Sequence, residues 1–178
     1  ASDVYKRQAL TIALAADGSM SWSMVPGYLI AQFAGAFLGA CLVYILFKGQ
    51  FDATEDKATK LGVFCTAPSI PNTGLNILSE AIGTFVLVFA IKGMAQVPNL
   101  DDGMGKLLVF GIIVSLGMSL GGLTGYAINP ARDLGPRLAH AVLPIKDKGS
   151  SNFGYGLIVP IIGPIIGALA AVLVYGLI

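Results

Sequence analysis

Charged residues are missing from long stretches of this chain, and this pattern limits its possible folds more than any other feature. Residues 20–47, 107–131 and 149–178 contain no charged side chain, and residues 77–91 contain only Glu80. A helix needs about 20 apolar residues to cross the hydrocarbon core of a bilayer. We therefore predict four membrane spans. They cover residues 25–47, 77–95, 107–124 and 156–178.

The composition points to the same class of protein. Of the 178 residues, 55% are hydrophobic and 12% are charged, whereas soluble domains carry about 25% charged residues. This excludes a disordered chain or a nucleic-acid-binding protein and argues against an ordinary soluble enzyme. The uncharged runs are rich in glycine and lack β-alternation, which favours an all-α polytopic membrane fold. Cys41 and Cys65 alone cannot form a disulfide framework or a metal site, and we expect no cofactor and no catalytic residues.

The four spans fix which loops share a side of the membrane. Loops 48–76 and 143–155 lie on one side, and loop 92–106 lies on the other with both chain ends. The first side carries five Lys or Arg residues in its loops and the second side two. The positive-inside rule weakly favours the first side as cytoplasmic. Loop 48–76 is polar and punctuated by Pro, Gly and Asn, so we expect it to be exposed.

An internal repeat divides the chain. Residues 29–40 match residues 157–168 at five of twelve positions, including two glycines with Gly-xxx-Gly spacing. This spacing lets helices approach closely in lipid, although Gly and Ile also recur by chance in membrane sequences. A short segment precedes each copy, at residues 9–14 and 129–137. Repeats that contain short, broken segments mark sites at the membrane midplane of transport proteins.

The two repeats are unequal in length. Two spans precede the short segment of the second repeat, but only eight polar residues precede that of the first. We therefore expect a fragment that lacks about two spans at its N-terminus, with residues 1–8 a non-native leader. A naturally shorter protein is the alternative. Within 9–178, the expected parts are the end of the first repeat (9–47), a connecting loop (48–76) and the second repeat (77–178).

A half-helix is predicted to begin at Asn129-Pro130. Asn is a strong N-cap, and Pro suits the first helical turn. The helix is too short to span before Gly135-Pro136 and the charged loop, so its positive end should point toward the membrane centre. An ordinary surface cap is the alternative, but it fits poorly with the uncharged run before it. Residues 125–128 should be extended, with the carbonyls of Gly125, Tyr126, Ala127 and Ile128 facing a wet cavity.

Arg132 should face that cavity, because a charged side chain at the bilayer centre costs about 3 kcal/mol or more. Its five fixed donors would bind hydroxyl groups and its charge would repel cations. Asp133 and Arg137 are four residues apart and should form a structural ion pair. Leu87 and Ile113 are candidates for an apolar wall opposite, although helix packing is the commoner role for such residues.

Glu80 has two possible roles. An acid within a span can be a proton relay, or it can be a buried acceptor that holds the backbone N–H groups of the loop before the half-helix. We favour the buried acceptor, because no second carboxylate continues a relay. His140, a lone histidine near a helix end, should be solvated rather than catalytic.

These motifs resemble the major intrinsic protein family of water and glycerol channels. The match is close over residues 121–136, which read GGLTGYAINPARDLGP, and over residues 159–168. The resemblance implies an aquaporin-like inverted repeat of spans and half-helices that meet at paired Asn-Pro-Ala motifs. This chain would hold four full spans and two half-helices. The resemblance also implies homotetramers with one pore in each subunit, and it places loops 48–76 and 143–155 outside, against the charge count.

The resemblance assigns roles to individual residues. Asn129, Pro130 and Ala131 form the second Asn-Pro-Ala motif. Gly117, Tyr126 and Arg132 form the selectivity filter, and Glu80 and Asp133 support the structure. Gly117 stands where water-selective members carry His, and Asp133 also resembles the glycerol-conducting branch. The first Asn-Pro pair is absent, because Arg7 and Gln8 occupy those places.

The resemblance implies a passive channel for glycerol, small polyols and water, with no enzyme activity, in the bilayer of a bacterial plasma membrane. Half-helix dipoles and Arg132 would exclude protons. The alternatives are a secondary transporter that uses Glu80 for ion coupling and a fragment that does not conduct. An intramembrane hydrolase would need a nucleophile or metal constellation, which the predicted spans lack.

Overall fold

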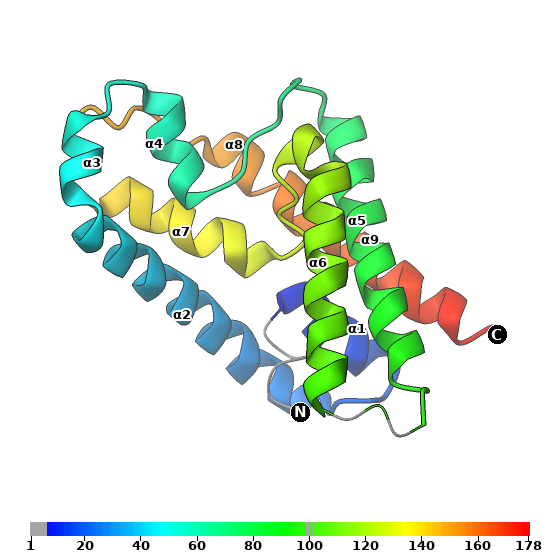
Figure 1. Cartoon of the computed structure of the whole chain (residues 1–178). Coiled ribbons are helices and arrows are strands. Elements are labelled where there is room, and N and C mark those ends of the chain that lie inside the picture. The colour runs from blue at the N-terminus through cyan, green and yellow to red at the C-terminus, as the bar shows by residue number, and fades with distance from the viewer. Residues whose placement is uncertain (1–6, 99, 101) are drawn as a thin grey trace.

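The computed structural model describes residues 7–98, 100 and 102–178, and in these residues helices alternate with irregular segments (Figure 1). The predicted leader lies mostly outside the described residues. The helices are α1 (Gln8–Ala16), the 3-10 helix η2 (Trp22–Met24), α2 (Val25–Leu46), α3 (Lys48–Ala53), α4 (Lys57–Phe64), α5 (Thr73–Met94), α6 (Asp102–Thr124), α7 (Pro130–Val142), α8 (Phe153–Gly156) and α9 (Val159–Tyr175).

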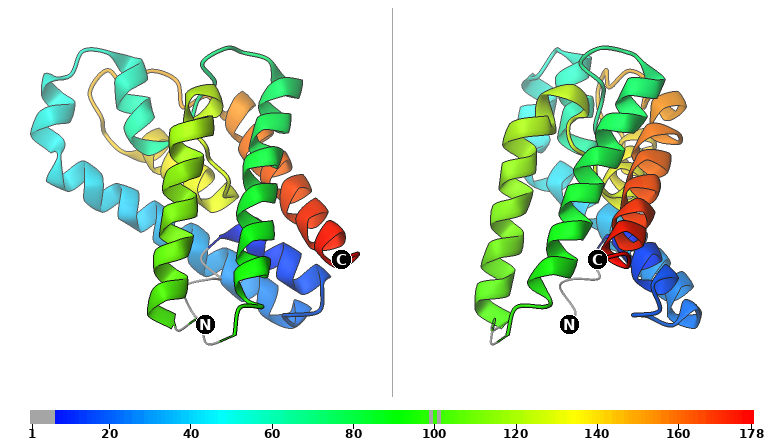
Figure 2. Two further views of the ribbon diagram at one scale, coloured as in Figure 1. Left: turned by 45° about the vertical axis from the view of Figure 1, so that its right-hand side comes forward. Right: turned by 90° about the vertical axis from the view of Figure 1, so that its right-hand side faces the viewer.

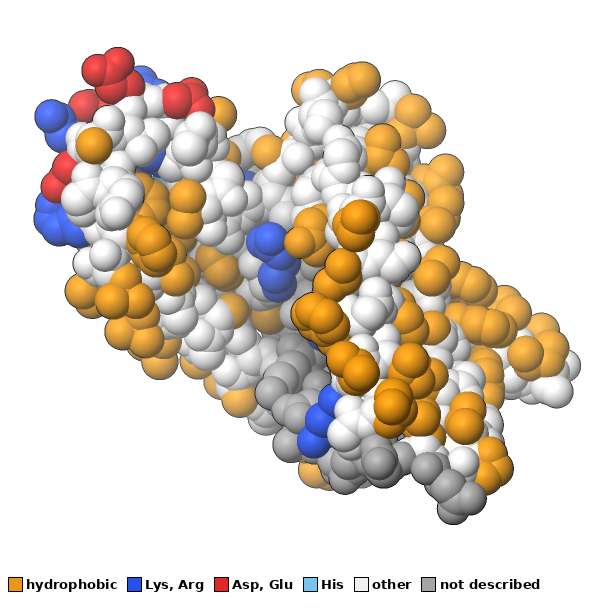
Figure 3. Space-filling view, viewed as in Figure 1, with side chains coloured by type: hydrophobic (Ala, Val, Ile, Leu, Met, Phe, Trp, Pro, Cys, Tyr) orange, Lys and Arg blue, Asp and Glu red, His pale blue; other side chains and the backbone are white. Residues whose placement is uncertain are grey.

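Four helical stretches in the described residues are long and apolar enough to cross a membrane, which confirms the four predicted spans. They are Trp22–Leu46, Thr73–Met94, Gly103–Thr124 and Phe153–Tyr175. The helices α1 and α7 are too short to span and are the two expected half-helices. Large apolar side chains are exposed on all four long helices, and Figure 3 shows them spread over the outer face of α6. An apolar exterior of this kind suits contact with lipid.

The two ends of the molecule carry different loops. Both views in Figure 2 place α3, α4 and the α7–α8 connection at one end, and the α1–α2 and α5–α6 connections at the other. This arrangement confirms that loops 48–76 and 143–155 share a side.

Glycines allow two close helix contacts. On α9, a side chain at Gly163 or Gly167 would overlap α5, because a Cβ at Gly163 would lie 2.8 Å from the Ile77 carbonyl oxygen. On α7, a Cβ at Gly135 would lie 2.8 Å from the Ala36 Cβ on α2. These contacts hold α9 against α5 and α7 against α2.

Most residues of the segment 48–76 are exposed, as expected, but the segment is not simply a loop. The segment contains α3 and α4, whose Phe51 and Phe64 rings pack together at 5.4 Å between centroids. Lys60 is also buried, and its ammonium donates to the carbonyl of Lys146 at 2.5 Å. The segment is therefore held to the α7–α8 connection by a few buried side chains, while most of its other residues face outward.

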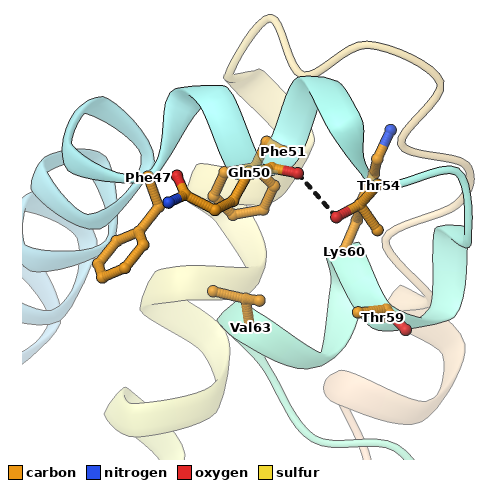
Figure 4. Close-up of a pocket in the computed structure, with 7 residues that line it drawn as sticks. All are labelled: Phe47, Gln50, Phe51, Thr54, Thr59, Lys60 and Val63. Carbon is orange, nitrogen blue, oxygen red and sulfur yellow. Dashed lines mark hydrogen bonds between the residues drawn. The ribbon is translucent and has the colours of Figure 1, made fainter.

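A small cavity of about 90 Å³ lies between α3 and α4 (Figure 4). Phe47 and Val63 border it, and Thr54 beside it donates to the Gln50 carbonyl at 2.7 Å. The cavity shares no lining residue with the larger cavity described below.

Candidate functional site

The two half-helices meet tip to tip at Asn129. The Asn129 side chain caps α7 by accepting from the backbone N–H of Ala131 at 3.2 Å. The same oxygen accepts from the backbone N–H of Gln8, the first residue of α1, at 3.1 Å. Each helix N-terminus carries a partial positive charge, so the contact brings two positive ends to one point. Anions and hydroxyl oxygens are favoured there, and cations are not.

A cavity of about 400 Å³ opens beside this contact, between α2 and α7. Its lining combines three small residues and Gln32 from α2 with residues at the start of α7. The lining residues are Ala31, Gln32, Gly35, Ala36, Asn129, Ala131, Arg132 and Pro136. Arg132 is exposed while its neighbours Ala131 and Asp133 are buried, and Figure 3 shows basic side-chain atoms in the hollow between α2 and α6. The structure thus brings Asn129 and Arg132 together on one wall.

The segment before α7 is not extended as expected. Gly125 has a φ of 77°, and Tyr126 and Ile128 each have a φ of 41°. Residues other than glycine rarely adopt this left-handed region, and each such residue costs on the order of 1–3 kcal/mol. The segment therefore needs partners that hold its backbone in place.

Glu80 on α5 supplies these partners. One carboxylate oxygen accepts from the Thr124 hydroxyl at 2.7 Å and the Ala127 N–H at 2.9 Å. The other accepts from the Ile128 N–H at 2.6 Å. Glu80 is 1% exposed, so it has no route to water of the kind that a proton relay needs. Its geometry is that of a buried acceptor that fixes the segment.

The Tyr126 ring lies against α6. A Cβ at Gly117 would be 3.1 Å from the ring carbon Cζ, and a Cβ at Gly121 would be 3.0 Å from Cδ1. The structure thus brings the predicted pair Gly117 and Tyr126 into contact. Neither residue borders the 400 Å³ cavity.

Asp133 and Arg137 form the expected ion pair, and both side chains are fully buried. Two Arg137 nitrogens donate to the two Asp133 oxygens at 2.8 and 3.0 Å. Thr66, in the α4–α5 connection, donates to Asp133 through its backbone N–H at 2.7 Å and its hydroxyl at 2.6 Å. Arg137 in turn donates to the carbonyls of Thr66, Ser151 and Asn152. A buried charge needs such full pairing, and the network ties two outer connections to α7.

The structure places three predicted residues in packed surroundings. Leu87 is 1% exposed in the core, and Ile113 packs against that core. They do not border the 400 Å³ cavity, and the apolar wall stays a prediction. The expectation that His140 is solvated is wrong, because the α7–α8 connection folds over it. His140 is fully buried, with its Nδ1 2.8 Å from the Ser151 hydroxyl and its ring 5.5 Å from that of Phe64.

The sequence analysis did not predict that Thr66 binds Asp133 or that Gly121 contacts Tyr126. Thr66 lies 67 residues before Asp133, and no spacing rule links two such positions. Gly121 carried a signal, because it follows Gly117 by one helical turn and so shares its face. Among the described residues, no group of three His, Cys, Asp or Glu side chains is placed to hold a metal ion.

Comparison with known proteins gives consistent matches. The sequence model of the major intrinsic protein family matches residues 7–175. The chain is 53% identical to the glycerol uptake facilitator protein of Bacillus subtilis over 93% of its length, and it spans 60% of that relative. It is 49% identical to the probable glycerol uptake facilitator protein of Thermotoga maritima, over 98% of this chain and 74% of the relative.

A solved structure shows the same fold. The aquaglyceroporin from Plasmodium falciparum superposes with a TM-score of 0.80 at 28% sequence identity. The alignment covers 96% of this chain and 70% of that one.

Proposed function

Since this chain belongs to the major intrinsic protein family, and is therefore an integral membrane protein, we propose that the protein is a passive channel for glycerol, small polyols and water. The observation that carries this proposal is the meeting of two positive helix ends at Asn129, beside the exposed Arg132. Hydroxyl oxygens find donors there, and a cation meets only positive charge. The relatives named for glycerol uptake support the choice of solute.

The geometry suits the passage of a solute through the protein without any covalent step. We infer that the Asn129 amide nitrogen and Arg132, both at the 400 Å³ cavity, donate to the solute, and that the backbone carbonyls of residues 125–128 accept from it. A neutral solute with several hydroxyl groups could then exchange its water for protein groups. Gly117 lets the Tyr126 ring lie against α6, which leaves space on the other side of the ring and favours a solute wider than water. We further propose that the protein works as a homotetramer in a bacterial plasma membrane.

The rival is a transporter coupled to an ion through Glu80. Its carboxylate accepts three hydrogen bonds and is 1% exposed. A coupling site must bind and release its ion during each cycle, and this carboxylate has no free, accessible oxygen to do so. The channel is therefore the better supported function.

Purified protein in liposomes tests the proposal. We expect the liposomes to swell in a glycerol gradient, with low temperature dependence and no response to a proton or sodium gradient. The variant Arg132→Ala should add a leak of protons or cations, measured with a pH-sensitive dye inside the liposomes. Uptake that follows the sodium or proton gradient would favour the transporter, and an unchanged leak in Arg132→Ala would contradict the role of the guanidinium.

A further inference from the structure

We propose that Gly121 is a positioning residue for the Tyr126 ring and thereby limits the size of the solute that passes. This inference rests on the proposed function, in which Tyr126 belongs to the selectivity filter. It adds a residue on α6 that touches neither the 400 Å³ cavity nor Arg132.

The two glycines support different parts of one ring. A Cβ at Gly117 would lie 3.1 Å from Cζ and 3.3 Å from Cε2 of Tyr126. A Cβ at Gly121 would lie 3.0 Å from Cδ1 and 3.4 Å from Cε1. Positions four apart lie one above the other on a helix face, so the ring extends along α6 from Gly121 to Gly117. The ring therefore packs on the α6 backbone at both glycines, and a side chain at either position would disturb this contact.

The backbone of Tyr126 has little freedom to adjust. On one side, the Gly125 N–H donates to the Gly121 carbonyl at 2.9 Å. On the other side, the Ala127 N–H is held by Glu80 at 2.9 Å. A methyl group at position 121 must therefore be accommodated by the Tyr126 side chain rather than by its main chain.

The ring has one direction in which to move. α6 blocks the ring on the glycine side, and Tyr126 as a whole is 37% exposed. Contacting carbon atoms lie about 3.5–4.0 Å apart, so a methyl group at Gly121 would push Cδ1 away by about 0.5 Å. This shift carries the ring away from the helix and narrows the space beside it.

Gly122 offers a matched control. It is the next residue on α6, but a Cβ there would have no atom within 4 Å. Both substitutions to alanine replace a glycine in the last turns of the same helix, so their effects on helix propensity are similar. Any difference between them reports the contact with Tyr126.

The first test measures solute selectivity in liposomes. We expect Gly121→Ala to lower the permeability to a five-carbon polyol, relative to glycerol, by about tenfold, because one methylene in a tight site changes discrimination by this much or more. Gly122→Ala should leave the ratio unchanged. Equal ratios in the two variants would overturn the proposal.

The second test needs no transport and compares melting temperatures in detergent. Gly121→Ala should lower the melting temperature of the protein with Tyr126, but not that of the Tyr126→Ala variant, because the ring is then absent. An equal effect of Gly121→Ala in both backgrounds would overturn the contact. If the unmodified protein passes no glycerol, the proposed function fails, while this comparison still decides whether Gly121 supports the ring.

Discussion

Replacing Glu80 with Gln removes the charge and one acceptor while keeping the size of the side chain. In the structure, one oxygen accepts two hydrogen bonds and the other accepts one, from the Ile128 N–H. The amide nitrogen will take the place with the single bond, because the opposite orientation loses two. An amide N–H then faces the Ile128 N–H where the acceptor used to be.

The loss can be estimated from this geometry. A hydrogen bond to a charged group contributes about 1.5–3 kcal/mol, and a buried donor left unpaired costs a similar amount. For a protein of this size, each kcal/mol lowers the melting temperature by about 2–4 °C. We therefore expect Glu80→Gln to lower the melting temperature by about 3–12 °C. We also expect slower glycerol permeation, because Ile128 loses its fixed position.

Thermal unfolding in detergent measures the first effect, and liposome swelling measures the second. Glu55 provides the control, because it is exposed between α3 and α4, so Glu55→Gln makes the same chemical change in water. We expect no shift for Glu55→Gln. If both variants melt at the temperature of the unmodified protein, the hydrogen bonds of Glu80 do not hold the segment before α7, and the reasoning is wrong.

Three further predictions concern other parts of the fold. Gly167→Ala should lower the free energy of unfolding by about 3 kcal/mol, the upper end for an overpacked core, because the added methyl group would overlap the Ala81 carbonyl. Gly39→Ala, where a Cβ has no atom within 4 Å, should not destabilise the protein, and denaturant unfolding curves of the two variants test the difference. Thr66→Val should lower the free energy of unfolding by about 1–3 kcal/mol, because buried Asp133 loses the hydroxyl group that donates to it. Thr66→Ser keeps this hydroxyl and should unfold as the unmodified protein does in the same denaturant titration. Burial raises the pKa of the Cys65 thiol to about 12, so only about one thiol in 10,000 is ionised at pH 8, and mass spectrometry should find maleimide on Cys65 only after denaturation.

The four spans and α7 could be predicted because their signals are local, whereas the short segment that became α1 followed from the internal repeat. A charged side chain in a span is costly wherever it occurs, so uncharged runs mark the four long helices. Asn129-Pro130 marks the start of α7 in the same way, because a cap acts on N–H groups within three residues. The site residues at the start of α7, Asn129 and Arg132, could therefore be predicted from the sequence.

The outer connections could not be predicted, because distant residues determine their burial. The Lys60 ammonium binds a carbonyl 86 residues away, and Thr66 binds a carboxylate 67 residues away. The polar composition of residues 48–76 correctly predicts that most of them are exposed, but nothing local shows which side chains are buried. His140 was misjudged for the same reason, since Ser151 covers it only after the chain turns back.

The repeated Gly-xxx-Gly motif shows how one local pattern can serve two purposes. In α9, Gly163 and Gly167 lie against the backbone of α5, and neither position has room for a methyl group. In α2, a Cβ at Gly35 or Gly39 would have no atom within 4 Å, and Gly35 borders the cavity that Arg132 lines. The spacing therefore predicts that a helix face is narrow enough for close approach. Whether another helix or a cavity lies against that face depends on the rest of the fold.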